Sequence, residues 1–472
     1  MSALFSIAEL LAATGGRAEN ISADHISGVS IDSRALKARA LFVAIRGERF
    51  DGHRFVGAAI KNGAVAALVS EENAPKLAGL PLIIVPDTLM GLVDIAKAAR
   101  KRSRAKIVAI TGSAGKTTTK EMVAGILERA GPTHASVKSY NNHWGVPLMV
   151  ANLAEAAKFA VFEIGMNHPC EITPLAKLVR PDLALVTNVG VAHIGNFANI
   201  DEIAEAKAEI FSGLEPGGVA ILNADHAQLA ILVTAAKARR ARVITYGFAA
   251  DADMRIKNYH GDENGSSAQI VSGDEKIEIG LVAAGSHMMA NAAGALAVAT
   301  QLGVARATSL AALAAFAAPA GRGQTVRLGP EKNPLLLIDE SYNANPSSMR
   351  AALAVFADIA PPVGGGQKIM VVGDMLELGQ QSQKLHEALC ADLRLAGADK
   401  IFLAGPYMRR LAGLLEGEIA IGAMAETGEE IKDAVMESLA YGDAVMVKGS
   451  KGVGLGKVVL AIRERFAAGQ VS

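Results

Sequence analysis

The stretch IVAITGSAGKTTTKEMVAGIL, residues 107–127, decides the fold of the region around it. Its four apolar residues at 107–110 have the pattern of a buried strand, and a turn containing Gly112 and Gly115 follows. Apolar residues at helical spacing, from Met122 to Leu127, then indicate a helix. Strand, turn and helix N-terminus in this order make an anion site, because free backbone N–H groups and the positive end of the helix dipole converge there.

The turn itself carries the residue types that bind a nucleotide phosphate. Its glycines let the backbone approach phosphate oxygens, Lys116 can reach a β- or γ-phosphate, and the Thr117 hydroxyl can ligate Mg²⁺. The loop is a shortened G-x-x-G-K-T-T form, because the first glycine of the usual spacing would fall at Ile110. An ordinary turn with a surface lysine is the alternative interpretation. The residues predicted to bind nucleotide here are Gly112, Ser113, Ala114, Gly115, Lys116, Thr117 and Thr118.

Length and composition set the broad class of protein. A chain of 472 residues is too long for one core and favours about three domains. Lys+Arg and Asp+Glu are both 47, and this zero net charge gives no indication of a nucleic-acid partner. The two cysteines, Cys170 and Cys390, are far apart, which fits a reducing compartment.

The sequence carries no pattern of a targeting or membrane segment. The N-terminal residues lack a basic region and include Glu9 where a signal peptide would be apolar. No stretch offers 18 uninterrupted apolar residues, so we expect no membrane insertion. We therefore expect a cytoplasmic protein, and we expect it to be a monomer.

Strand and helix patterns alternate along most of the chain and predict an α/β protein with three domains. Residues 1–84 read as a small α/β unit, 85–318 as a larger unit with a parallel sheet around the phosphate loop, and 319–472 as a third unit of the dinucleotide-fold type. Short polar/apolar alternation at 251–279 predicts an antiparallel excursion within the second unit. In the third unit, one helix is predicted over residues 383–396.

Three polar residues of the second unit stand out. Glu163 is the only charge in the apolar strand 159–164, and a Mg²⁺ ligand opposite Thr117 or a buried structural carboxylate would both explain it. His193 follows the strand 183–187 and belongs to the same sheet edge, although a lone histidine there is usually only a satisfied polar residue. Lys207 lies on a helix and, by spacing alone, reads as a solvated lysine.

Taken together and in order, the polar segments resemble the ATP-dependent Mur ligases over nearly the full length. Any one of them is weak, but their order and spacing are specific to this family. The segments are 32–34, 47–53, 111–118, 141–147, 163–168, 187–193, 206–210, 223–225, 285–291, 321–322, 339–346, 373–379 and 448–450.

The resemblance implies an amide ligase that works through an acyl phosphate. It implies that the γ-phosphate of ATP passes to the C-terminal carboxylate of UDP-N-acetylmuramoyl-tripeptide, and that the amine of D-alanyl-D-alanine then attacks. Such a reaction needs charge neutralisation at the phosphoryl group more than a protein nucleophile. The three domains would bind the UDP-substrate, bind ATP, and close over ATP with the dipeptide, in chain order.

The family also implies roles for individual residues. Lys116 would steady the phosphates, Thr117 and Glu163 would hold one Mg²⁺, and Glu163 with His193 would hold a second. Lys207 would be carbamylated and would join the metal site, because a cation beside a metal would be electrostatically wrong. Adenine, ribose and phosphate contacts would come from Asn291, Asp339 and Arg322. Substrate contacts would come from Ser33, Arg34, Asn141, Asn142, Tyr342, Asn343 and Asn345.

Other interpretations are compatible with parts of the pattern. A ligase that adds diaminopimelate or lysine to the UDP-dipeptide is the nearest rival within the family, but it carries a D-N-P-R type string that is absent here. Folylpolyglutamate synthase shares the middle domain but not the 32–34 segment. A nucleotide-binding regulatory protein would lose its metal ligands. Lys451 stands where the family more often has Arg, so a bidentate carboxylate clamp is not expected there.

Overall fold

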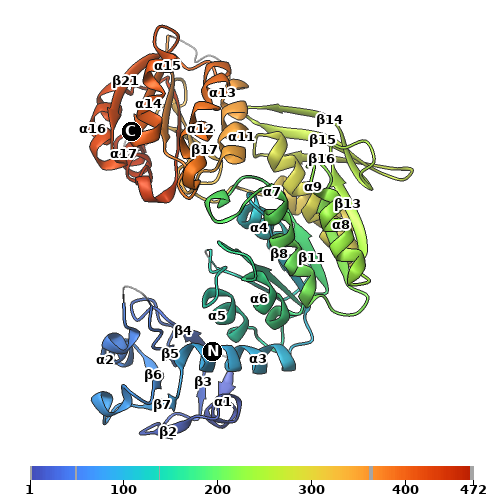
Figure 1. Cartoon of the computed structure of the whole chain (residues 1–472), viewed down its shortest axis with the longest axis vertical. Coiled ribbons are helices and arrows are strands. Elements are labelled where there is room, and N and C mark those ends of the chain that lie inside the picture. The colour runs from blue at the N-terminus through green and yellow to red at the C-terminus, as the bar shows by residue number, and fades with distance from the viewer. Residues whose placement is uncertain (1–2, 48–49, 138, 361–364, 468–472) are drawn as a thin grey trace.

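The structure is a computed structural model that describes residues 3–47, 50–137, 139–360 and 365–467. Figure 1 shows three α/β bodies in chain order, with the N-terminal body in blue, the central one in green and yellow, and the C-terminal one in orange and red. The α/β class with three domains is therefore confirmed. The domain limits 1–84, 85–318 and 319–472 stay predictions.

The N-terminal body is built on a small mixed sheet. Its strand order is β2 (Arg17–Glu19), β7 (Leu82–Val85), β6 (Ala64–Ser70), β5 (Ala40–Val43) and β4 (Gly28–Ser30), with only β2 antiparallel. Helices α1 (Ile7–Thr14) and α2 (Val56–Lys61) belong to this body. His53 fixes the end of the segment 47–53, because its ring lies 2.6 Å from Asp51 Oδ1 and accepts the Ser70 N–H at 3.0 Å. Glu48 and Arg49 of that loop lie outside the described residues.

The central body contains a nine-stranded sheet, and the phosphate loop follows β8 (Lys106–Thr111), the third strand from one edge. Strands β8, β10 (Phe159–Glu163) and β11 (Leu183–Val186) run parallel side by side, as buried apolar strands do when helices cover both faces. The full order is β16 (Glu275–Leu281), β15 (Gly265–Ser272), β14 (Met254–Asp262), β13 (Arg242–Gly247), β12 (Val219–Asn223), β11, β8, β10 and β9 (Thr133–Ala135). Strands β14 to β16 are antiparallel, which confirms the predicted excursion.

Helices on both faces of this sheet close two separate cores. Helices α4 (Lys116–Glu128) and α9 (Ser286–Gln301) pack together over one face, and α9 is buried along most of its length because it is rich in alanine and methionine. The other face carries α5 (Gly145–Ala151), α6 (Ile172–Val179), α7 (Ile200–Ala208) and α8 (Leu229–Ala238). Helix α10 (Arg306–Ala314) ends the central region.

The C-terminal body has a six-stranded sheet that is parallel except at one edge. Its order is β17 (Gln324–Leu328), β18 (Leu335–Glu340), β22 (Ala444–Lys448), β19 (Lys368–Gly373), β20 (Lys400–Ala404) and β21 (Ala420–Ala425). Only β17 is antiparallel. The helices are α11 (Pro346–Ala357), α12 (Ser382–Glu387), α13 (Cys390–Leu395), α14 (Pro406–Arg410), α15 (Ala412–Leu415), α16 (Gly428–Ser438) and α17 (Gly456–Ala467).

The single helix predicted over residues 383–396 is wrong. The structure divides it into α12 and α13 at residues 388–389, where the Leu389 N–H bonds to the His386 carbonyl three residues back. His386 is fixed at this point, since its ring nitrogens meet the Ser382 carbonyl at 2.6 Å and the Met375 N–H at 2.9 Å. These contacts tie the end of α12 to the neighbouring turn, and the chain tightens to a 3₁₀-type bond there.

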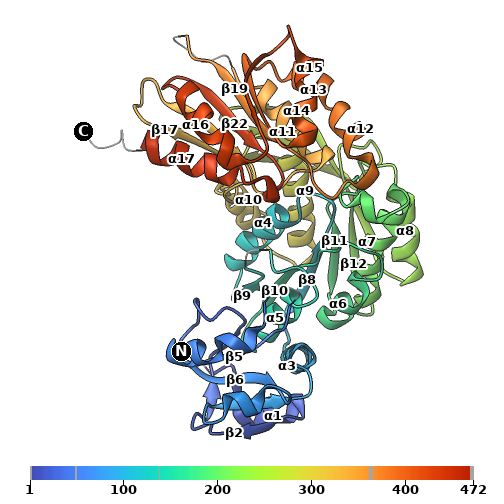
Figure 2. The same cartoon turned by 60° about the vertical axis from the view of Figure 1, so that its left-hand side comes forward.

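The bodies are joined by direct contacts. Helix α3 (Thr88–Arg102) packs against α1 of the N-terminal body and α5 of the central body. Asn152 adds a two-way bond to Val29, donating to its carbonyl and accepting its N–H, both at 2.9 Å. In Figures 1 and 2 the C-terminal body lies against the end of the central body that is farther from the N-terminal body. Across the described ranges, no helix is long and apolar enough to cross a bilayer.

Candidate functional site

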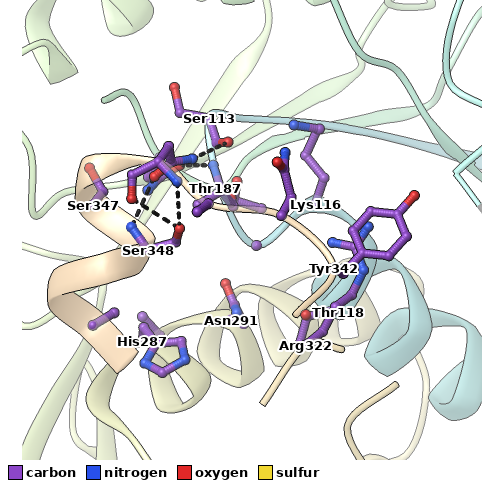
Figure 3. Close-up of a pocket in the computed structure, with 18 of the residues that line it drawn as sticks. Ser113, Lys116, Thr118, Thr187, His287, Asn291, Arg322, Tyr342, Ser347 and Ser348 are labelled. Carbon is purple, nitrogen blue, oxygen red and sulfur yellow. Dashed lines mark hydrogen bonds between the residues drawn. The ribbon is translucent and has the colours of Figure 1, made fainter. Parts of the chain in front are cut away.

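A cavity of about 570 Å³ lies where the central and C-terminal bodies meet. Parallel strands β8, β10 and β11 end on this side, so their following loops all face it, as ligand-binding loops do in open α/β sheets. The cavity is lined by Lys116, Glu163 and His193 of the central body and by Arg322 and Tyr342 beyond it. Figure 3 shows the side chains of the phosphate loop, α9 and α11 converging here.

The phosphate loop adopts the conformation that its glycines permit. Gly115 has a φ of 79° and caps α4, and Gly112 has a φ of 151°. A Cβ at Gly112 would lie 1.8 Å from Thr187 Oγ1, so no other residue fits. Asn188 fixes the part of the loop between Gly112 and Gly115, because its side-chain oxygen accepts the Ala114 N–H at 2.8 Å. The N-terminus of the 13-residue helix α4 therefore opens on the cavity.

Lys116 lies at the first position of α4 and is turned back over the loop. Its Nζ donates to the Gly112 carbonyl at 2.6 Å. Burial lowers the pKa of Lys116, the nearby Glu163 carboxylate opposes that shift, and the Arg322 cation adds to it. Lys116 and Arg322 are therefore two neighbouring cations at the cavity. Within the described ranges, neither one is hydrogen-bonded to a carboxylate. An anionic ligand would balance their charge.

Glu163 is almost wholly buried at the end of β10, and its two oxygens are held separately. Thr117 Oγ1 donates to one at 2.7 Å, and Asn141 Nδ2 donates to the other at 2.7 Å. The structure thus places the predicted pair Thr117 and Glu163 in direct contact. It also explains why Asn141 is positioned at the cavity wall.

His193 follows β11 and lines the same cavity. Its Nδ1 lies 2.6 Å from Oε2 of Glu377, which comes from the C-terminal body. This contact with His193 lowers the pKa of the Glu377 carboxyl. Because one ring nitrogen faces a carboxylate, the other is the nitrogen left for a ligand.

Lys207 lies on α7 and is buried, not solvated as its spacing alone suggests. Among the described residues, its ammonium has no hydrogen-bond or ion-pair partner. Burial, together with the neighbouring charge of Lys116, lowers the pKa of Lys207 well below its ordinary value. An amine in this setting loses its proton readily and becomes nucleophilic.

The donor set fits a cation that is held jointly by protein and phosphate. Within the described ranges no group of three His, Cys, Asp or Glu side chains lies close enough to form a metal cage. Thr117 and Glu163, however, present a hydroxyl and a carboxylate 2.7 Å apart beside the phosphate loop. Mg²⁺ on nucleotides takes one or two carboxylates and completes its shell with phosphate oxygens and water. Thr117 and Glu163 therefore fit one ion, and His193 supplies a further nitrogen on the same cavity.

Two residues are predicted to contact the nucleoside, and only one of them, Asn291, lines the cavity. Asn291 lines the cavity from α9, and its amide lies so near the phosphate loop that a Cβ on Gly115 would be 2.6 Å from its oxygen. Asp339 is buried, and its oxygens accept the Gly321 N–H at 3.0 Å and the Ser341 hydroxyl at 2.7 Å. Asp339 thus braces the linker that carries Arg322, and its role towards a ribose stays a prediction.

The linker and the loop before α11 bring the remaining predicted residues to the cavity. Arg322 stacks on the Tyr342 ring, with 4.0 Å between the guanidinium carbon and the ring centroid, as Figure 3 also shows. Asn343 lines the cavity as well. Asn345 caps α11 by accepting the Ser348 N–H at 2.9 Å, and its amide donates to the Ser113 carbonyl of the phosphate loop at 3.3 Å.

Three predicted substrate residues lie elsewhere. Asn142 accepts the Gly145 N–H at 2.9 Å and so shapes the turn before α5. Ser33 and Arg34 belong to the N-terminal body, where Arg34 Nε donates to Asp32 at 2.9 Å. That bond raises the pKa of Arg34, and the charge of Tyr140 in the central body adds a smaller effect. Neither Ser33 nor Arg34 lines the cavity beside the phosphate loop.

The structure adds cavity residues to which the sequence patterns assign no role. Lys448 is buried at the cavity and donates to Glu340 Oε2 at 3.2 Å, and Ser139 contacts both Arg322 and Tyr342. Helix α11 contributes Ser347 and Ser348 (Figure 3). The serines follow Asn345 and Pro346, and this pattern is typical of a helix N-terminus. The sequence therefore contains a signal that points to Ser347 and Ser348. Nothing local in the sequence points to Ser139.

Comparison with known proteins gives matches along most of the chain. Residues 25–122 match the Mur ligase family, catalytic domain, residues 110–299 the Mur ligase middle domain, and residues 321–451 the Mur ligase, glutamate ligase domain. A curated relative from Escherichia coli is named UDP-N-acetylmuramoyl-tripeptide–D-alanyl-D-alanine ligase. It is 35% identical over 93% of this chain and 94% of its own length.

Solved structures give the same picture. A MurF crystal structure from Acinetobacter baumannii has a TM-score of 0.83 at 31% identity and covers 98% of this chain and 99% of that one. A MurF ligase from Thermotoga maritima in complex with ADP has a TM-score of 0.76 at 25% identity and covers 94% and 97%.

Proposed function

The chain belongs to the Mur ligase family, and on that premise we propose that it joins D-alanyl-D-alanine to UDP-N-acetylmuramoyl-tripeptide with ATP. The products are UDP-N-acetylmuramoyl-pentapeptide, ADP and phosphate. The observation that carries this proposal in the structure is the buried Glu163, held between Thr117 of the phosphate loop and Asn141. The name of the relative from Escherichia coli supplies the substrates.

The reaction has two chemical steps. An oxygen of the tripeptide carboxylate forms a bond to the γ-phosphorus of ATP, the bond to the β-phosphate oxygen breaks, and ADP leaves. The amine of D-alanyl-D-alanine then attacks the carbonyl carbon of the acyl phosphate and loses a proton. The C–O bond to phosphate breaks, and an amide and inorganic phosphate remain.

The residues of the chain act by binding and charge compensation. Lys116 and the N-terminus of α4 hold the β- and γ-phosphates, and Arg322 adds a second cation. Asn291 binds the adenine side and Asp339 the ribose side. Two Mg²⁺ ions would supply charge neutralisation at the phosphoryl oxygens and at the carboxylate. One ion would be held by Thr117 and Glu163 and the other by Glu163 and His193.

Lys207 is proposed to be carbamylated. Its lowered pKa makes the amine available to CO₂, and the product is an anion that suits a cation-rich site better than an ammonium beside Lys116. A Lys207→Ala variant should lose activity and recover part of it with added short carboxylates. Undiminished activity of this variant would remove the carbamate from the account.

The two substrates would reach the cavity from different bodies. Ser33 and Arg34 would bind the UDP-substrate in the N-terminal body, with Asn141 and Asn142 towards its reacting end. Tyr342, Asn343 and Asn345 would place the dipeptide beside ATP, since Tyr342 and both asparagines line the cavity. We further propose that the protein acts as a monomer. The nucleotide substrates and the unpaired cysteines support a bacterial cytoplasmic location.

Purified protein tests the proposal directly through its substrate dependence. With UDP-N-acetylmuramoyl-tripeptide, ATP and Mg²⁺, phosphate release should require D-alanyl-D-alanine. Release triggered instead by diaminopimelate or lysine with the UDP-dipeptide would contradict the assignment. It would favour the ligase that adds one of these amino acids. Nucleotide binding without turnover under either condition would favour a regulatory protein.

A further inference from the structure

Ser139 is a small central-body residue that joins two parts of the C-terminal side of the cavity. Its Oγ accepts a hydrogen bond from Arg322 Nη2 at 3.1 Å and another from the Tyr342 hydroxyl at 3.0 Å. The partners lie 183 and 203 residues away along the chain. All three side chains line the cavity. Arg322 also stacks on Tyr342, so the three side chains form one connected group.

Counting protons in this group leaves one hydroxyl donor unused. Ser139 and Tyr342 carry one hydroxyl proton each, and the hydrogen bond that they share uses one of these two protons. Either hydroxyl of Ser139 and Tyr342 can donate in their shared bond, and in both arrangements the second proton remains. Among the described residues, no acceptor for that proton is bonded to either oxygen.

The charges around the group decide what the free proton can bind. Arg322 lies close enough to Lys116 for its charge to lower the pKa of that lysine. Two residues beyond Ser139, Asn141 donates to Glu163. Both hydroxyls thus line the same cavity as the cations Lys116 and Arg322. An anionic oxygen is the acceptor that this surrounding favours.

We propose that Ser139 is a positioning residue that fixes Arg322 and Tyr342 across the domain boundary, so that one hydroxyl of the Ser139–Tyr342 pair donates to an anionic oxygen of the bound substrates. This inference rests on the proposed ligase function. The oxygen belongs to the γ-phosphoryl group or to the carboxylate that receives it. Both lie on the path of phosphoryl transfer, and both gain from a donor that is held in place before the substrate arrives.

Nucleotide binding gives a test that needs no turnover. Binding of ADP and of the non-hydrolysable analogue AMP-PNP is measured by calorimetry with Mg²⁺ for wild type, Ser139→Ala and Tyr342→Phe. If the γ-phosphoryl group accepts the proton, each variant should bind AMP-PNP about 10- to 100-fold more weakly, the size expected for one hydrogen bond to a charged group. Binding of ADP should stay within about twofold, since the β-phosphate is held by Lys116 and the helix N-terminus.

If the carboxylate accepts the proton, both nucleotides keep their affinity. The KM for UDP-N-acetylmuramoyl-tripeptide should then rise about 10-fold or more in the same variants. The double variant should lose no more than the worse single variant, because the two hydroxyls act as one unit. Ser139→Thr keeps the hydroxyl and should restore wild-type values.

Ser136→Ala is the matched control in the same segment. The Ser136 hydroxyl is buried without a hydrogen-bond partner among the described residues, so its removal should leave all these constants unchanged. Equal weakening of ADP and AMP-PNP in Ser139→Ala, or no change in any constant, would overturn the proposal. If Ser139→Ala does not fold, Tyr342→Phe tests the same hydrogen bond from the C-terminal body. Failure of wild type to use D-alanyl-D-alanine would refute the ligase function alone, since the nucleotide arm is read without it.

Discussion

His193 of the central body and Glu377 of the C-terminal body meet with Nδ1 and Oε2 only 2.6 Å apart. Both residues have left-handed backbone conformations, with φ values of 60° and 64°. Such conformations are unfavourable for residues other than glycine and concentrate at functional positions. Beside this pair, a Cβ on Gly379 would lie 2.8 Å from the Gly195 Cα. The two loops are thus fitted to each other at the edge of the cavity.

The contact predicts that Glu377 orients His193 for a metal ion. Glu377→Gln should lower kcat/KM by about 10- to 100-fold and shift the Mg²⁺ dependence of phosphate release to higher concentration, as loss of an outer-shell carboxylate does. The exposed Glu437 of α16 offers the control, and Glu437→Gln should behave as wild type. An unchanged Mg²⁺ dependence in Glu377→Gln would mean that the contact only joins the two bodies.

Two glycines near the phosphate loop should respond to alanine in opposite directions. Gly112→Ala should destabilise the central body by about 1–3 kcal/mol through its backbone and by a similar amount through the clash with Thr187. At Gly125, inside α4, an added Cβ would meet nothing within 4 Å. Gly125→Ala should therefore stabilise the helix by about 0.5–1 kcal/mol. Denaturant unfolding measures both, and ADP binding should fail only in Gly112→Ala.

His134 should make the stability of the central body sensitive to acid. Burial lowers the pKa of His134 below its ordinary value of 6.5, against the hydrogen bond to the Met149 carbonyl. The unfolded chain therefore binds a proton that the folded chain does not. The free energy of unfolding should fall as the pH drops from about 6.5 towards the folded pKa.

Thermal melts at several pH values measure this effect. In His134→Gln, which keeps an N–H donor for Met149, the loss of Tm on going below about pH 6.5 should be smaller than in wild type. His260→Gln, at an exposed position on β14, should leave the wild-type slope. An identical slope in His134→Gln and wild type would exclude His134 as the source.

Local patterns in the sequence predicted the fold and the central wall of the site. The strand, turn and helix of residues 107–127 fold as a continuous unit, and Glu163 was visible as a single charge in an apolar strand. The sequence patterns do not predict the contacts that join residues of different bodies. Ser139 meets Arg322 and Tyr342 only through the packing of two bodies, and Glu377 reaches His193 in the same way. The division between α12 and α13 depends on His386 binding Met375, which no helical periodicity records.

Transfer of oxygen from the tripeptide to phosphate tests the central claim most directly. UDP-N-acetylmuramoyl-tripeptide is prepared with ¹⁸O in its C-terminal carboxylate, and the phosphate released with ATP and D-alanyl-D-alanine is analysed by mass spectrometry. An acyl phosphate leaves one carboxylate oxygen on phosphorus, so each phosphate should carry one ¹⁸O atom from a fully labelled carboxylate. Unlabelled phosphate would show that ATP was cleaved by water and would contradict the account.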